Sequence, residues 1–334
     1  MIGRGQTLRI EIPVAEEIRN DLVKLWDTTL GRVTEISNRG FLGRELKDNR
    51  NVLYLETHIR KIIGSCMLTT NLSGPKLGAF GHVATDPEFR RAGIATALCQ
   101  QAVEEFRDDG GIAVLLGTHS PESGDGAAAR IYYRLGWRFL AGTNVMINVS
   151  DRTSPEEFLV NYFAKVGTST VCEGTAADRV LMTPLIVTPH DWHILDTNPP
   201  CNIHSTRYIK QNSCNGLYRQ YEEIREGGKG NWFTARTADG RVVGLASAKL
   251  TGSYGCSIDG FVHNRHMDSW QDLILETINW ADTQGVKNCF ATVCVEDEEK
   301  VLAFEQLGFR KRRTTSTLQF GERILETVCM DNEA

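Results

Sequence analysis

The sequence predicts an α+β fold made of two tandem domains, each a mostly antiparallel mixed sheet flanked by helices. Three observations support this. The chain has 334 residues, which suits two domains at roughly 100–200 residues each. Strand and helix signals alternate through its first half, and their order recurs in its second half. We therefore place one domain at residues 1–150 and the other at residues 151–334.

The first domain is predicted to contain a strand, a helix, three antiparallel strands, a helix, a strand, a short helix and a final strand. Alternation of apolar and polar residues marks the opening strand, and helical spacing of apolar residues marks the first two helices. Two β-rich runs around a charged turn predict a hairpin, and an unbroken apolar run predicts a buried strand. The segments are 7–13, 18–26, 52–72 (the hairpin), 77–86, 94–106, 112–120, 125–136 and 138–149.

The second domain repeats this order. Asp239-Gly240 between two β-rich runs predicts another hairpin. The match is sharpest where "YYRLGWR" (132–138) corresponds to "FEQLGFR" (304–310), which we interpret as a tandem duplication. The segments are 231–250 (the hairpin), 256–263, 270–281, 287–295, 298–308 and 315–320, the last being read as the final strand.

Composition excludes several function classes. Hydrophobic content of 41% and charged content of 24% are typical of a globular protein. The net charge of −5 argues against a nucleic-acid surface, which needs an excess of Lys and Arg. No apolar run approaches the roughly 18–20 residues of a membrane span, and the N-terminus lacks the apolar centre of a signal peptide. We expect a cytoplasmic protein that binds neither nucleic acid nor membrane.

The nine cysteines form no CxxC pair, which favours reduced, buried thiols over a disulfide framework or a zinc site. His190, His193 and His204 show no ligand spacing on a shared face. No metal site is predicted.

A basic turn at the start of the second helix indicates an anion site. The first amides of a helix are free of intrahelical partners and carry the positive end of its dipole. Here Arg90 and Arg91 precede Gly93, and unblocked helix-start amides follow through Ala95. The turn is neither a Walker loop nor a dinucleotide fingerprint, because G-K-S/T and G-x-G-x-x-G are both absent. It predicts a cradle for the pyrophosphate of another cofactor.

Two stretches resemble the GCN5-related N-acetyltransferase (GNAT) superfamily, and the resemblance covers the N-terminal half. "VATDPEFRRAGIATAL" (83–98) fits the family's strand, turn and Q/R-x-x-G-x-G/A helix start, with Arg90, Gly93 and Ala95 at the defining positions. "AARIYYRLGW" (128–137) is similar to the family's A-x-x-x-Y-x-x-x-G-F helix.

The resemblance implies a fold whose fourth and fifth strands splay apart, with acetyl-CoA as acyl donor in the gap. Asp125 stands where the family often has Asn, although it could simply cap the following helix. The residues implied in pyrophosphate binding are Arg90, Arg91, Ala92, Gly93, Ile94 and Ala95. Val83, Ala84 and Thr85 are implied along the pantetheine arm. Asp125 and Tyr132 are also implied in cofactor binding.

The resemblance also implies catalytic roles. Tyr132 takes the family's general-acid position, with Tyr133 as a substitute, and a phenol is protonated at neutral pH. The usual base position is occupied by Gly81. Its neighbour His82 is the candidate base, although regular strand alternation would point it to the opposite face. His119 and Ser120 are alternatives near the acceptor.

The second copy lacks these features. Its corresponding turn, "FVHNRHMDSW" (261–270), has no glycine before the helix, and Met267 and Asp268 would obstruct and repel a pyrophosphate. Phe304 replaces Tyr132 and has no proton to donate. We expect a degenerate, non-catalytic domain.

The predicted function is acetyl-CoA-dependent N-acetylation of a primary amine on a small molecule or peptide. Alternatives are another acyl-CoA donor, a sulfur or oxygen acceptor, a non-catalytic CoA-binding sensor, or a purely structural paired fold. A monomer is expected, because two such domains in one chain can replace dimerisation, with a dimer left open.

Overall fold

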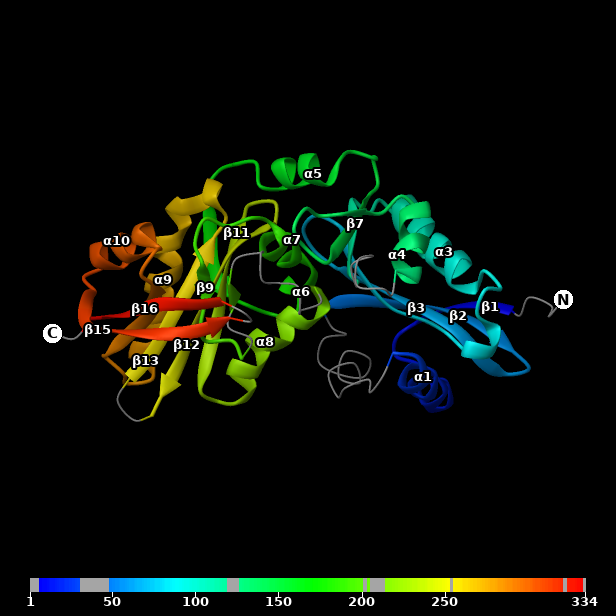
Figure 1. The fold of residues 1–334 in the computed structure, drawn as a ribbon, viewed down its shortest axis with the longest axis horizontal. Helices are drawn as coiled ribbons and strands as arrows, with labels where there is room; N and C mark the ends of the chain where they lie inside the picture. Colours follow the sequence, from blue (N-terminus) through cyan, green and yellow to red (C-terminus); the bar gives the residue numbers. More distant parts are fainter. Residues whose placement is uncertain are drawn as a thin grey trace. The chain divides into compact units, whose positions relative to one another are not determined.

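The computed structural model describes residues 6–30, 48–118, 126–200, 203–204, 214–252, 255–320 and 323–332. The chain divides into two compact units, and Figure 1 shows that each contains its own sheet and helices. The N-terminal unit is Met1–Phe158 with Arg179–Leu181 and Ser213–Gly216; the C-terminal unit is Leu159–Asp178, Met182–Asn212 and Leu217–Ala334.

The N-terminal sheet has the order β1-β2-β3-β4-β5-β7-β6. Its neighbours are antiparallel except for β4 and β5, which are parallel. The three consecutive antiparallel strands and the mixed sheet expected from the sequence are therefore confirmed. The strands are β1 (Gln6–Glu11), β2 (Asn49–His58), β3 (Lys61–Asn71), β4 (Leu77–Thr85), β5 (Ala113–Gly117), β6 (Arg138–Phe139) and β7 (Val145–Val149).

Helices cover both faces of this sheet, with α1 on one side and α3 and α4 on the other (Figure 1). Each face has its own apolar cluster. Trp26 of α1 is buried in one cluster, and Phe106 of α3 is buried with Trp137 in the other. Burial of such large side chains is the main favourable contribution to the fold. The helices are α1 (Glu16–Thr29), the 3-10 helix η2 (Pro87–Phe89), α3 (Ile94–Asp108) and α4 (Ala127–Arg134).

The C-terminal sheet has the order β8-β11-β12-β13-β14-β16-β15, again with one parallel pair, β13 and β14. The sequence indicated segment 315–320 as the final strand, but β16 follows it and pairs between β14 and β15. Alternation is weak in β16 because Thr327 is fully buried beside Val328. The strands are β8 (Ser169–Glu173), β11 (Gly230–Thr237), β12 (Val242–Thr251), β13 (Gly255–Val262), β14 (Cys289–Cys294), β15 (Arg310–Phe320) and β16 (Arg323–Asp331), with β9 (Ile194–Asp196) and β10 (Ile203–His204) in a separate two-stranded sheet.

The longest helix of this part of the chain, α9, packs on β12 and β13 and buries Trp270, Leu273 and Ile274. Within the described ranges, no helix has both the length and the apolar character needed to cross a bilayer. The remaining helices are α5 (Pro155–Tyr162), α6 (Asp178–Leu181), α7 (Thr183–Val187), α8 (Cys214–Glu226), the 3-10 helix η5 (Asn264–Ser269), α9 (Trp270–Thr283) and α10 (Glu298–Gln306).

Candidate active site

The two parallel strands of the N-terminal sheet separate partway along their length. β4 pairs with β5 only from Leu77 to Ala79, although β4 itself continues to Thr85. Residues 80–85 of β4 therefore present an edge to a gap instead of to β5. This pairing confirms that the central strands are splayed.

β4 contains a bulge beside the gap. The register with β3 shifts by one residue, so that Cys66 stands opposite both His82 and Val83. His82 has a φ of +53°, which few residues other than glycine adopt. Its carbonyl accepts a hydrogen bond from Ser65 Oγ at 2.9 Å. Because a bulge bends a strand and redirects its side chains, regular alternation does not apply at His82.

The His82 ring packs on the α1 side of the sheet. Its centroid lies 4.7 Å from that of Trp26, whose Nε1 donates to Ser65 Oγ at 2.9 Å. Burial lowers the pKa of His82 to about 4. The imidazole is therefore neutral at pH 7 and only weakly basic.

The turn after β4 leads into an uncapped helix. Gly93 is the N-cap of α3 with a φ of +82°, and a Cβ at this position would meet no heavy atom within 4 Å. No side chain caps α3, and its first turn contains no acidic residue. The amides that begin at Ile94 thus lack intrahelical partners, and Arg90 and Arg91 beside them are exposed. This arrangement suits an anion that approaches the backbone closely.

Asp86 fixes the start of this turn. Its carboxylate accepts from the backbone N–H of Glu88 at 3.1 Å and from Lys61 Nζ at 2.7 Å. The hydrogen bond from Lys61 lowers the pKa of Asp86, so the carboxylate stays ionised at neutral pH. The neighbouring Lys61 compensates a charge that would otherwise oppose an anion at the turn.

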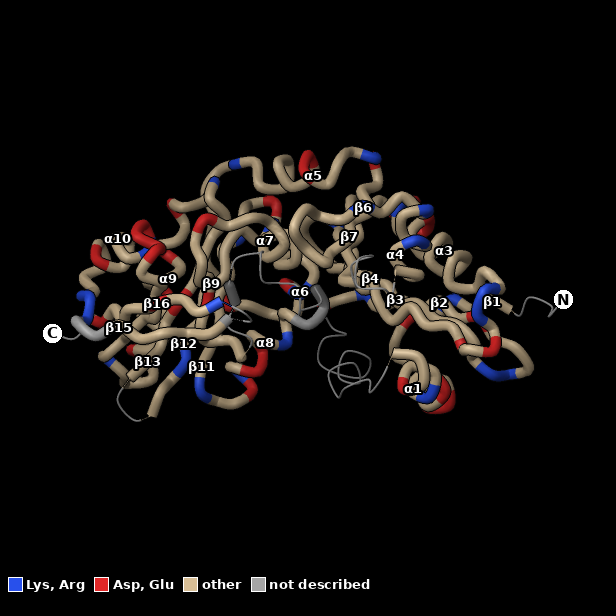
Figure 2. Tube along the Cα trace, in the orientation of Figure 1, with Lys and Arg blue, Asp and Glu red and all other residues tan. Residues whose placement is uncertain are grey.

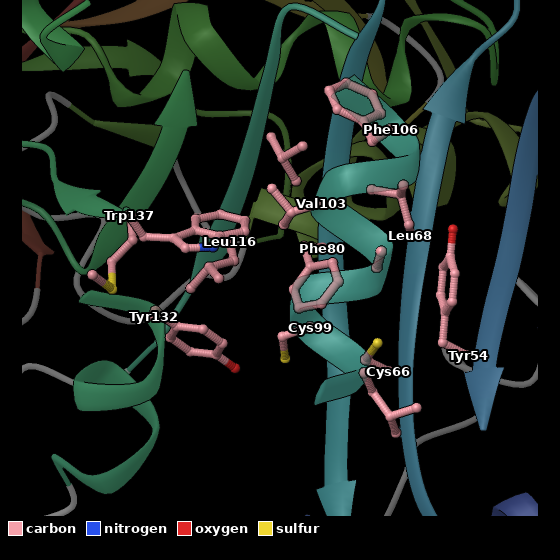
Figure 3. Packing of buried hydrophobic residues seen from close by; sticks show 14 of the residues in the cluster. Tyr54, Cys66, Leu68, Phe80, Cys99, Val103, Phe106, Leu116, Tyr132 and Trp137 are labelled. Carbon is pink, nitrogen blue, oxygen red and sulfur yellow. The ribbon is translucent and has the colours of Figure 1, made fainter. Parts of the chain in front are cut away.

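Tyr132 lies on α4, in the apolar cluster under α3. Its side chain is 6% exposed, and its ring centroid is 5.9 Å from that of Trp137. Figure 3 shows its hydroxyl pointing toward the Cys99 side chain. Burial raises the pKa of Tyr132, and the thiols of Cys99 and Cys66 raise it further. The phenol is therefore protonated throughout the neutral range.

The structure does not bring the two predicted catalytic side chains into one cluster. His82 packs in the cluster under α1 with Trp26, whereas Tyr132 packs in the cluster under α3. Trp26, Cys66 and Cys99 are neighbours of these groups that sequence reasoning did not identify. Asp125, His119 and Ser120 lie outside the described residues.

The corresponding turn of the C-terminal unit is closed. The 3-10 helix η5 runs directly into α9, whose N-cap Ser269 is already in the helical region. Asp268 forms an ion pair with Lys165 at 2.9 Å, and Met267 is exposed. Phe304, the counterpart of Tyr132, is fully buried.

Residues Ile194–Thr197, which we call the β9 segment, contact both parted strands of the C-terminal sheet. β13 and β14 pair only at Cys256 and Ser257. Beyond that point Thr197 donates its N–H to Asp259 of β13 at 3.1 Å, and Ile194 packs against Cys294 of β14.

Buried charges hold this segment in place. Lys300 Nζ donates to the carbonyls of Ile194 and Leu195 at 2.9 and 3.2 Å. Lys300 also pairs with Asp259 at 2.6 Å, and both side chains have no exposed surface. Asp196 lies nearby, and burial, together with the charge of Asp259, raises the pKa of Asp196 to about 7.

One set of potential metal ligands occurs in the described residues of this unit. Atoms of His193, Cys294 and Asp297 lie within 4.8 Å of one another. His193 Nδ1 is 2.7 Å from Asp297 Oδ1, and the Asp297 carboxylate also accepts the N–H groups of His193 and Ile194 at 2.7 and 3.1 Å. Hydrogen bonding to the β9 segment therefore accounts for the position of Asp297.

Comparison with solved structures returns acetyltransferases that each cover about half of this chain. A putative acetyltransferase from Salmonella typhimurium, solved with its cofactor acetyl-CoA, is 17% identical and is matched over 50% of this chain and 96% of its own, with a TM-score of 0.38. A phosphinothricin acetyltransferase from Sinorhizobium meliloti in complex with acetyl-CoA is 15% identical over 49% and 88%, with a TM-score of 0.38. A ribosomal-protein-alanine N-acetyltransferase from Brucella melitensis is 15% identical over 48% and 98%, with a TM-score of 0.38.

None of the curated proteins matches the chain. The sequence model of the acetyltransferase (GNAT) family matches residues 15–137, a range that includes α1, the parted strands, the basic turn and α4. Residues 15–137 of this chain therefore form a domain of the acetyltransferase (GNAT) family.

Proposed function

We propose that the N-terminal unit is an acetyl-CoA-dependent N-acetyltransferase that acylates a primary amine of a small molecule or peptide. The observation that carries this proposal is the start of α3. Its uncapped amides follow Gly93, whose backbone is left-handed, and the turn that leads to them comes from β4, which has separated from β5. The family match supports an acyltransferase.

The backbone is proposed to hold the donor in two places. The pyrophosphate would accept hydrogen bonds from the amides of residues 91–95, with the Arg90 and Arg91 guanidiniums adding charge-assisted contacts. The pantetheine arm would lie along the open β4 edge at residues 83–85. A Cβ at Gly93 would project into open space, with no protein atom within 4 Å. Because the donor is proposed to occupy that space, its close approach to the backbone depends on the absence of a side chain at this position.

Acetyl-CoA supplies an activated acyl group as a thioester. The neutral amine attacks the carbonyl carbon, the C–S bond breaks, and the amine loses a proton while the leaving thiolate gains one. We assign Tyr132 as donor of the second proton. Its burial keeps the phenol protonated, and its hydroxyl points out of α4 toward α3 (Figure 3). The amides of Ala84 and Thr85 are the proposed donors to the developing oxyanion.

His82 remains the candidate for deprotonating the amine. It is neutral at pH 7 and can accept a proton, although its low pKa makes it a weak base and its ring packs under α1. His82→Gln should lower kcat without changing acetyl-CoA affinity. An unchanged kcat would remove His82 from the mechanism.

A CoA-binding sensor is the rival function, since it needs the anion site but no proton donor. Another acyl donor or a sulfur or oxygen acceptor is also compatible with the site, because the features described bind the CoA part of the donor. We propose that the C-terminal unit binds no acyl-CoA, given its closed turn and the segment between its strands. A cytoplasmic location and a monomeric state stay predictions.

The deciding experiment measures thiol release from acetyl-CoA with a panel of amines, alongside calorimetric titration of the intact protein with acetyl-CoA. Turnover of any amine, with binding, supports the enzyme. Binding without turnover by any amine, thiol or alcohol supports the sensor. No heat with any CoA species would overturn both.

A further inference from the structure

The N-terminal unit has a groove that lies away from the parted strands β4 and β5. Its volume is about 720 Å³, and its walls come from the later turns of α3, the end of α4, β7 and the stretch 152–155. It begins at Gln100, seven residues after Gly93, which is about 10 Å further along the helix axis. Residues 83–95, the proposed donor site, do not line it.

The walls of this groove are strongly basic in an acidic protein. Arg107, Arg134, Arg138 and Arg152 line it, and Glu104 is the one acidic residue found there among the described side chains. Four positive and one negative charge give +3, whereas the whole chain carries −5. Figure 2 shows basic positions gathered around the β6 and α4 labels. We call this groove, which is lined by the four arginines, the arginine groove.

In the described part of the chain, no carboxylate forms an ion pair with any of these four arginines. Arg138 donates instead to the carbonyls of Trp137 and Tyr133 at 2.8 and 3.3 Å. The Nε of Arg107 is buried and has no hydrogen-bond partner. Grouping like charges without counter-charges is unfavourable, and an anionic ligand would remove that cost.

A neighbouring groove of the same unit shows the opposite arrangement. It has a volume of about 370 Å³, and two arginines, Arg9 and Arg50, line it. Arg9 pairs there with Glu105 at 2.8 Å, and Arg50 pairs with Glu11 at 3.1 Å and with Asp109 at 3.3 Å. The protein thus neutralises surface arginines with its own carboxylates in one groove and leaves them available in the other.

A buried side chain supports the guanidinium of Arg107. Asn148 of β7 is 4% exposed, and its Nδ2 donates to the carbonyl of Leu135 at 2.9 Å. Its Oδ1 faces Arg107 Nη2 at 3.5 Å. Because Asn148 is anchored at the end of α4 and Arg107 belongs to α3, this contact fixes one cation between the two helices.

We propose that the arginine groove binds a small polyanion that carries two or more phosphate or carboxylate groups. The planar guanidinium fork matches both groups through paired hydrogen bonds. A single inorganic anion would leave most of 720 Å³ empty, whereas a volume of this size is typical of sites for small organic ligands. The ligand would connect α3, which begins the donor site, to α4, which carries Tyr132.

The test is calorimetric titration of the full chain with sodium tripolyphosphate and, separately, with citrate, at low and at physiological salt. Arg134→Glu and Arg152→Glu change exposed side chains and should each weaken binding about tenfold or more. Lys24→Glu on α1 makes the same change of charge elsewhere and should alter affinity less than about twofold. Thermal melts establish that all three variants are folded.

The tighter of the two probes identifies the class of the ligand. No heat with either probe, or an equal loss in Lys24→Glu, would overturn the proposal. The titration is repeated with saturating CoA. Unchanged affinity supports a separate site, while competition would assign the arginines to the donor and overturn it. These readouts do not require acyl transfer, so they stand or fall apart from the proposed enzyme.

Discussion

Each unit has its own sheet of the same topology, but the two units differ at the point where the parallel strands of that sheet separate. In both, seven strands follow the same order, and the parallel pair separates after a few residues. In the N-terminal unit the following turn opens a helix with uncapped amides, and β4 contains a bulge. In the C-terminal unit η5 runs directly into α9, and β13 pairs with β12 without a register shift. The two units therefore have the same architecture and differ in a short turn and a few side chains, which is where we propose that their functions differ.

The largest expected effect concerns the residue that differs between the paired helices, Tyr132 in α4 and Phe304 in α10. Tyr132→Phe removes the proposed proton donor and should lower kcat by about 10²-fold or more. The acetyl-CoA dissociation constant should not change. Steady-state kinetics and calorimetry measure the two quantities.

Tyr133→Phe is the matched control, because it removes the same hydroxyl one residue further along α4, from a side chain that is 43% exposed. If both variants lose activity equally, or if Tyr132→Phe retains wild-type kcat, Tyr132 is not the general acid.

The next effect tests the buried charges of the C-terminal unit. Lys300→Met leaves Asp259 without its partner and releases the carbonyls of Ile194 and Leu195, so it should lower the free energy of unfolding by about 3–5 kcal/mol. Urea denaturation followed by tryptophan fluorescence measures this. Lys287→Met is the control, because Lys287 is exposed. A loss below about 1 kcal/mol would show that the pair does not hold the β9 segment.

A smaller effect distinguishes the two helix starts. Reversing both charges in Arg90→Glu/Arg91→Glu should weaken acetyl-CoA binding about tenfold to a hundredfold, since each guanidinium contact to a phosphate is replaced by repulsion. Arg265→Glu, in the corresponding turn of the other unit, should change affinity by less than about twofold. Equal losses at the two turns would contradict a single donor site in the N-terminal unit.

The smallest effect is on the pH dependence of stability, where the units should differ in sign. The folded pKa of His82 is about 4, below its unfolded value near 6.5, so its contribution is lost as pH falls from about 6.5 to 4. The folded pKa of Asp196 is about 7, above its unfolded value near 3.9, so its contribution is lost as pH rises from about 4 to 7.

Substitution of these two residues separates the contributions. Relative to the wild type, His82→Phe should reduce the loss of stability on acidification, and Asp196→Asn should reduce the loss on raising the pH. Chemical denaturation at pH 4.5, 5.5 and 7 measures both slopes. If both substitutions changed the pH dependence of the free energy of unfolding in the same direction, the environment described for His82 or for Asp196 would be wrong.

Much of the fold could be predicted from the sequence because its signals are local. Glycine before an apolar helix, the hairpin turns and the unbroken apolar run each determine a short segment, and all three recur in the structure. The start of α3 at Ile94, directly after Gly93, was predicted for the same reason, whereas the left-handed φ of Gly93 is a finding of the structure.

Other features depend on pairing between distant residues. The bulge at His82 and Val83 arises from the register with β3, and nothing in the residues of β4 alone reveals the shift. The position of the β9 segment could not be predicted from the sequence, because its contacts are made with Asp259 and Lys300, more than sixty residues away. The side of the sheet on which His82 packs could not be predicted without that register.

The contacts of Ile194–Thr197 have a consequence for how each unit responds to a ligand. Strands that separate leave main-chain groups in need of partners. In the C-terminal unit residues Ile194–Thr197 contact both parted strands, so we expect its melting temperature to be indifferent to coenzyme. The N-terminal unit is proposed to bind the donor at its parted strands, and its thermal stability should therefore rise with donor concentration.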